Sequence, residues 1–190
     1  MSDKLITAPS TEPVSLTEAK AHLRVTSTDD DDLITALIVA ARAAAEHELQ
    51  RSLITQTLEK ALDMFPDAIQ LLSPPVQSVT SVKYLDVDGV EQTLSSSSYT
   101  LDNASDSTPA WLTPAYGYDW PETYAEVNAV KVRYVAGWGS ASLVPQPIKQ
   151  WMLLQIGHWY ENRESVNIGN ITSKLDYVTF LLDRYRIWGL

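Results

Sequence analysis

The run Asp29–Asp32 is the part of this chain that most resembles a cation site, because carboxylate oxygens are the ligands that Ca²⁺ and Mg²⁺ prefer. An EF-hand loop, however, needs spaced ligands, a glycine and a distal glutamate, and this run has none of them. Carboxylates at the start of a helix are stabilised by the helix dipole. We therefore expect capping or solvation here rather than a metal site.

The histidines and the C-terminal glutamates offer little catalytic chemistry. His22, His47 and His158 are widely spaced and match no metal-binding helix motif. Glu161 and Glu164 have the composition of an acid/base pair, but they lie beside Arg163 at the predicted end of a helix, where capping and ion pairing are expected. Nucleophile-elbow, phosphate-loop and dinucleotide-binding fingerprints are absent from the sequence. We expect no enzymatic activity, no metal and no cofactor.

A cluster of five aromatic residues within fourteen positions is the second candidate site. Its members are Trp111, Tyr116, Tyr118, Trp120 and Tyr124. Aromatic side chains bury a large area at small entropic cost, so they suit a sugar-binding platform or a protein interface. A small hydrophobic core packed under a long loop explains the same composition, and the sequence leaves these alternatives open.

Composition excludes several classes of protein. The 190 residues carry 24 acidic and 14 basic side chains, a net charge of −10, which argues against a general nucleic-acid binder. An acidic wall would nevertheless let DNA slide past without adhering. The chain has no cysteine, no apolar run of transmembrane length and no signal-peptide region near its first residue, so we expect a soluble product of a reducing compartment.

Helical patterns lie towards both ends of the chain. Ser15 and Glu18 form a capping-box motif that predicts a helix over 16–23, and a longer helix is expected over about 31–53. Prolines 145 and 147 introduce a helix over about 146–163. This helix should pack against the long one, and a last helix is expected over about 175–185.

The middle of the chain has the alternating pattern of strands, and Asp88-Gly89 predicts a hairpin. The expected strands are 55–64, 69–72, 79–87, 90–94, 99–102, 110–113 and 127–136. The predicted class is α+β, a small helical bundle from both chain ends with an inserted antiparallel β-module. Residues 1–13 are expected to form a flexible arm, 14–54 and 145–190 the helical domain, and 55–144 the β-module.

Three segments together resemble a known family. In chain order, they are PVSLTEAKAHLRV with the helix after it, AYGYDWPET, and VRYVAGWG followed by VPQPIKQWMLLQIGHWYENRE. Together they resemble the head–tail connector (adaptor) proteins of tailed phages, of the gp6-like and phiE125 gp8-like families. The resemblance implies a virion protein, made in the host cytoplasm, that forms a ring, twelvefold in the particle, under the portal. Such a ring extends the DNA channel and is a platform for head-completion (stopper) or tail proteins.

Under this resemblance the partners are other copies of the chain, the portal, the next head-completion or tail protein, and double-stranded DNA that passes without sequence-specific contact; no membrane is involved. The acidic residues expected to face the channel are Asp29, Asp30, Asp31, Asp32, Glu46 and Glu48. The residues expected to dock on the portal are Arg184, Tyr185, Arg186, Ile187 and Trp188, with Trp188 folding back onto its own bundle as the alternative. The competing hypothesis for the whole chain is a monomeric β-rich ligand- or carbohydrate-binding module that uses the aromatic cluster at 111–124.

Overall fold

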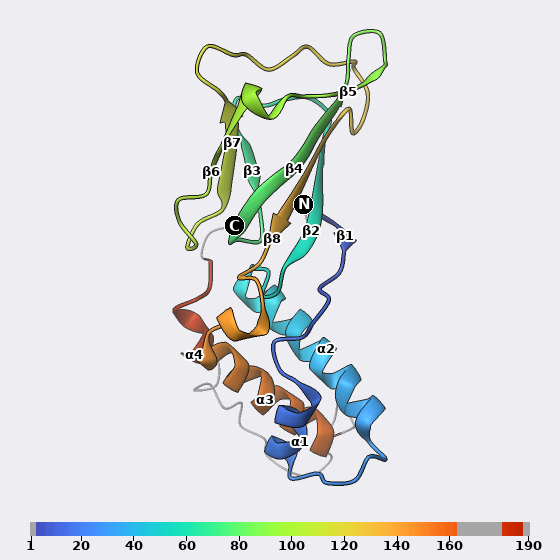
Figure 1. Cartoon of the computed structure of the whole chain (residues 1–190), viewed down its shortest axis with the longest axis vertical. Coiled ribbons are helices and arrows are strands. Elements are labelled where there is room, and N and C mark those ends of the chain that lie inside the picture. The colour runs from blue at the N-terminus through green and yellow to red at the C-terminus, as the bar shows by residue number, and fades with distance from the viewer. Residues whose placement is uncertain (1–2, 163–179, 188–190) are drawn as a thin grey trace, which may run out of the picture. The chain divides into compact units, whose positions relative to one another are not determined.

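The computed structural model describes residues 3–162 and 180–187 and divides the chain into two compact units. The β unit comprises Met1–Ser10 and Thr55–Trp138, and the helical unit comprises Thr11–Ile54 and Gly139–Leu190. Helices and antiparallel strands both occur, which confirms the predicted α+β class (Figure 1).

The β unit consists of two antiparallel sheets that enclose one hydrophobic core (Figure 1). The larger sheet has the strand order β1-β2-β8-β4-β5 and the smaller has β3-β7-β6. The strands are β1 (Lys4–Thr7), β2 (Gln56–Leu62), β3 (Ile69–Leu71), β4 (Val76–Leu85), β5 (Glu91–Thr93), β6 (Tyr99–Asp102), β7 (Ala110–Pro114) and β8 (Val130–Ala136). Leu58 and Val132 from the larger sheet and Leu112 from the smaller are among the buried residues of this core.

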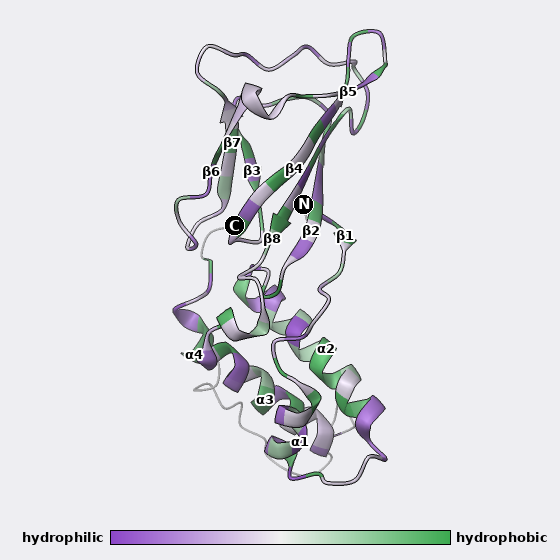
Figure 2. Cartoon of the chain, in the orientation of Figure 1, coloured by the Kyte–Doolittle hydropathy of each residue, from purple (hydrophilic) through white to green (hydrophobic). Residues whose placement is uncertain are grey.

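Strand β8 has the expected period of two. Val130, Val132 and Tyr134 are buried, while Lys131 and Arg133 between them face outward. Hydrophobic and hydrophilic bands also follow one another along β4 (Figure 2). The larger sheet therefore has one face in the core and one face in solvent.

The predicted hairpin at Asp88-Gly89 is confirmed between β4 and β5. Gly89 has a φ of +76°, a conformation that side chains disfavour, and its N–H donates to the Asp86 carbonyl at 2.8 Å. The Asp86 N–H in turn donates to the Val90 carbonyl at 3.0 Å.

The N-terminal residues differ from the flexible arm that the sequence predicts. Lys4–Thr7 form β1, which pairs antiparallel with β2. The Tyr134 hydroxyl donates to the Asp3 carboxylate, which also lies 3.7 Å from the Lys60 ammonium. Because β1 is held by pairing with a strand fifty residues away and is itself mostly exposed, no local hydrophobic pattern signals it.

The helical unit contains α1 (Leu16–Leu23), α2 (Asp31–Leu49), α3 (Gln146–Glu161) and α4 (Phe180–Asp183). The capping box of α1 is confirmed: the Glu18 N–H donates to the Ser15 hydroxyl at 3.2 Å, and the Ser15 N–H donates to the Glu18 carboxylate at 2.7 Å. The packing of α2 against α3 is also confirmed, with Ile148, Met152 and Ile156 fully buried (Figure 1). Short 3-10 turns cover Ser96–Ser98 and Ala141–Leu143.

Two helix boundaries differ from expectation. The helix α2 ends four residues early, because Gln50 adopts a left-handed conformation with a φ of 55° and caps it. The last helix is described only as α4, and residues 175–179 of its predicted range lie outside the described residues.

Candidate interaction surfaces

Two of the four aspartates at the start of α2, Asp30 and Asp31, hold the helical unit together. The Asp30 carboxylate accepts from the Tyr160 hydroxyl at 2.6 Å, which ties α2 to α3. The Asp31 carboxylate pairs with the Lys20 ammonium of α1 at 2.5 Å. Asp29 and Asp32 are exposed. Among residues 3–162 and 180–187, no group of three His, Asp or Glu residues has the geometry to hold a metal ion.

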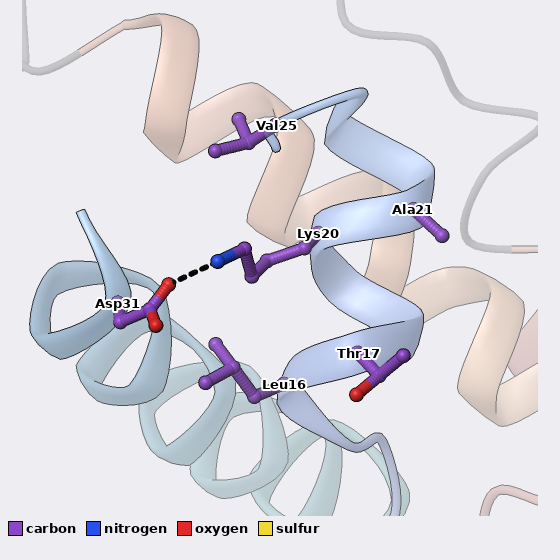
Figure 3. A pocket seen from close by; sticks show the side chains of 6 residues that line it. All are labelled: Leu16, Thr17, Lys20, Ala21, Val25 and Asp31. Atoms are coloured by element: carbon purple, nitrogen blue, oxygen red, sulfur yellow. Dashed lines mark hydrogen bonds and ion pairs between the residues drawn. The ribbon is translucent and has the colours of Figure 1, made fainter. Parts of the chain in front are cut away.

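A shallow pocket lies between α1 and α2 (Figure 3). Its lining residues are Leu16, Thr17, Lys20, Ala21, Val25 and Asp31. The Lys20 and Asp31 side chains point toward one another across it, with Leu16 beside them (Figure 3). Because its charged groups neutralise each other, the pocket presents no free charge to a ligand.

The other two acidic candidates, Glu46 and Glu48, brace the C-terminal end of α2. The Glu46 carboxylate accepts from the Leu53 N–H at 2.9 Å and from the Arg42 guanidinium at 2.7 Å. Burial raises the pKa of Glu46, and these two hydrogen bonds oppose that rise. The Glu48 carboxylate pairs with the Arg186 guanidinium at 2.7 Å.

The C-terminal residues expected to dock on a portal also have contacts inside their own unit. The Ile187 N–H donates to the Leu49 carbonyl at 3.1 Å, and Ile187 is buried. The Arg51 guanidinium donates to the Tyr185 carbonyl. Arg184 is exposed, and Trp188 lies outside the described residues. A deletion from Tyr185 onward would therefore remove part of the helical core as well as any docking site.

The aromatic cluster divides into anchored and exposed members. Trp120 stacks on Phe65 with ring centroids 4.8 Å apart, and both rings pack against the core of the β unit. Tyr116, Tyr118 and Tyr124 are exposed on the segment 115–129, which we call the aromatic loop. Trp120 therefore fits the hypothesis of a small hydrophobic core under the loop, whereas the three tyrosines lie on the surface.

Backbone and side-chain contacts position the aromatic loop. The Tyr124 N–H donates to the Leu85 carbonyl at 3.0 Å, and the Asn128 N–H donates to the Asp63 carboxylate at 2.9 Å. Trp111 lies outside the loop, on β7, with 40% of its surface exposed. The loop thus presents three exposed tyrosines from a base that these hydrogen bonds fix.

Within residues 3–162 and 180–187, the remaining catalytic candidates form no constellation. Glu161 ends α3 and is exposed, while Glu164 lies outside the described residues. His158 and His22 are exposed on different helices, and His47 is exposed on α2. Nothing in this placement joins a base to a nucleophile.

A cluster of basic residues lies on the outer face of the larger sheet and was not predicted from the sequence. Strand register places Lys131 opposite Lys83, and places Glu59 between Arg133 and Lys4. We call Lys4, Lys83, Lys131 and Arg133 the sheet cations. The alternation along β8 marks Lys131 and Arg133 as outward-facing, but only the register brings the other two beside them.

Residues 13–111 match the model of the phage gp6-like head-tail connector proteins. The chain belongs to this family. The resemblance noted in the sequence is thereby confirmed, and the protein is a structural connector of phage-like particles. No helix of the described part is long and apolar enough to cross a bilayer.

Solved structures of particle necks have the same fold. The chain is similar to one in the neck of an empty gene transfer agent (GTA) particle computed with C6 symmetry, at 25% identity and a TM-score of 0.82, covering 100% of this chain and 97% of that one. Similar chains in the virion of the native GTA particle and in its neck computed with C12 symmetry are each 24% identical, with TM-scores of 0.81 and 0.79 and the same coverage. No curated protein sequence matches the chain.

Proposed function

We propose that this connector protein works as a closed ring, twelvefold in the particle, that lies under the portal, extends the DNA channel and receives the next head-completion or tail protein. The observation that carries the proposal is the end-to-end similarity to a chain of a GTA neck, at a TM-score of 0.82. Family membership supports it and favours a connector over a carbohydrate-binding module. The work is then done by binding surfaces, and no bond is made or broken.

A ring of identical subunits needs two different patches that complement each other on neighbouring copies. It also needs a channel wall that does not retain DNA. Of the acidic residues considered for that wall, Asp29 and Asp32 fit best, because they are exposed and, among the described residues, form no hydrogen bond or ion pair with another helix. Asp30, Asp31 and Glu46 hold other parts of the helical unit, and the exposed Glu48 pairs with Arg186.

The portal contact in this proposal is the C-terminal segment. Arg184 is its exposed guanidinium, whereas Ile187 is buried in the helical unit. Point variants therefore test docking better than a truncation does. Arg184→Ala should reduce attachment to portal-bearing capsids, and Arg24→Ala, which removes another exposed arginine of the helical unit, should not.

The experiment is to add each purified variant to portal-bearing capsids that lack the connector and to count bound copies per capsid. Both variants should keep the circular dichroism and the thermal transition of the parent. Equal occupancy for Arg184→Ala and Arg24→Ala would remove the C-terminal segment as the docking site. Failure of the parent chain to bind these capsids at all would refute the proposed function.

A further inference from the structure

The basic residues of the β unit gather on one face of an otherwise acidic unit. The residues of the β unit include twelve acidic and five basic side chains, a net charge of −7 out of the −10 of the chain. Four of those five basic residues are the sheet cations. Residues 84–130, by contrast, contain eight acidic residues and neither lysine nor arginine. The unit therefore carries a local basic face on an acidic body.

The basic face contains an unfavourable contact that a partner would relieve. Lys83 and Lys131 are direct cross-strand neighbours, and like charges in that position repel. Lys83 has a carboxylate partner, Glu91 at 2.7 Å, in a pair that is almost half exposed on both sides. Lys131 is exposed and forms no ion pair within the described residues, although Glu91, which is already paired with Lys83, attracts it and offsets part of the repulsion. A carboxylate supplied from outside would satisfy Lys131 and offset the repulsion.

The aromatic loop has the complementary chemistry. Asp119, Glu122 and Glu126 are exposed on it, interleaved with the exposed tyrosines. Carboxylates pair with lysine and arginine, and tyrosine rings stack on guanidinium groups and attract ammonium groups. Trp120 and the backbone contacts at Tyr124 fix the base of the loop, so little ordering entropy opposes binding.

We propose that the aromatic loop of one copy docks on the sheet cations of a second copy. The loop borders the sheet cations of its own chain, because the Tyr124 N–H donates to the Leu85 carbonyl two residues beyond Lys83. Lys83 and Lys131 nevertheless remain exposed, so the loop and the sheet cations are neighbouring but distinct patches of the β unit. Contact between unlike patches of identical chains is heterologous, and it closes into a ring when the rotation allows. This inference rests on the proposed function, in which the subunits form a ring.

Duplex DNA is the other polyanion that a basic face attracts. The observations favour a second copy, because the face also holds Glu59, which accepts from Arg133 at 2.7 Å, and Glu91. With four cations and two carboxylates the face carries a net charge of only about +2, little for a surface that binds phosphates. The body of the neighbouring β unit is strongly acidic and is present at equal copy number.

Disulfide trapping tests the contact directly, because the chain contains no cysteine. Single-cysteine variants Lys131→Cys and Glu122→Cys of the full chain are mixed and oxidised. The expected product is the mixed disulfide, in excess over both homodimers, since a heterologous contact brings unlike positions together. The matched control pairs Lys131→Cys with Ser105→Cys, which is exposed on the loop at the opposite end of β7. A mixed yield no higher than that of this control overturns the proposal.

Charge reversal at Lys131 provides a second test, in which the stability of the subunit and its self-association are measured separately. Lys131→Glu exchanges the repulsion from Lys83 for repulsion from Glu91, so its melting temperature should stay close to that of the parent. Self-association should weaken at least about tenfold, because like charges now meet at the contact. Combining Lys131→Glu with Glu122→Lys should restore part of the lost self-association. Added salt should weaken the self-association of the parent protein.

The outcomes separate this contact from the ring itself. Rings that form as well with Lys131→Glu as with the parent would refute the contact while leaving the proposed function intact. A trapped mixed disulfide in chains that form open polymers instead of rings would support the contact and refute the ring. A Lys131→Glu variant that loses affinity for duplex DNA, with self-association unchanged, would reassign the face to nucleic acid.

Discussion

Shortening Ile156 to alanine should destabilise the helical unit strongly. Ile156 lies on α3 with no exposed surface, in the layer where α3 packs against α2. The change deletes three carbon atoms and leaves a cavity, and such changes at buried isoleucines cost about 2–5 kcal/mol. We expect about 3 kcal/mol here, with Ile156→Val costing about 1 kcal/mol. Ile156→Asp should prevent folding of the unit, since an unpaired carboxylate would be buried as well.

Urea unfolding followed at 222 nm is the suitable assay, because it reports mainly on the helices. The urea concentration at the midpoint should be highest for the parent, lower for Ile156→Val and lowest for Ile156→Ala. The slope of the unfolding free energy against urea concentration should be unchanged. The control is Leu143→Ala: Leu143 is 61% exposed, and we expect a change within about 0.5 kcal/mol. An Ile156→Ala protein as stable as the Leu143→Ala protein would show that α3 does not contribute this face to the core.

Three further changes test individual contacts. Ser15→Ala removes the hydroxyl that caps α1 and should cost about 1 kcal/mol in urea unfolding. Ile187→Ala should cost about 2 kcal/mol, whereas Arg184→Ala should leave the midpoint unchanged; equal effects would contradict the buried position of Ile187. The raised pKa of Glu46 means that its contribution to stability is present below its ordinary pKa of 4.5 and is lost as the pH rises through the raised value. Glu46→Gln should therefore flatten the decline of the unfolding free energy between pH 4.5 and the raised pKa, and an unaltered pH profile would count against this burial effect.

Local patterns predicted the elements whose stabilisation is itself local. The capping box predicted α1 to the residue, because both of its hydrogen bonds join Ser15 to Glu18. The Asp88-Gly89 pair predicted the β4–β5 hairpin for the same reason. Alternation along β8 predicted which face is buried, and the proline pair at 145 and 147 predicted the start of α3.

Features that depend on contacts between distant segments could not be predicted in this way. Strand β1 exists because it pairs with β2, and its own residues are mostly exposed. The sheet cations come from β1, β4 and β8, so no window of the sequence contains them together. Likewise, the sequence predicts that the aspartates at the start of α2 are capping or solvated residues. In the structure, Asp30 contacts α3 and Asp31 contacts α1.

Cryo-electron microscopy of the neck of the particle that carries this protein tests the central claim most directly. Under the proposed function we expect twelve copies in one closed ring between the portal and the next neck or tail protein. Within that ring, the aromatic loop of each copy should lie on the sheet cations of its neighbour. Density for this chain away from the head–tail junction, or as isolated copies that do not touch one another, would contradict it.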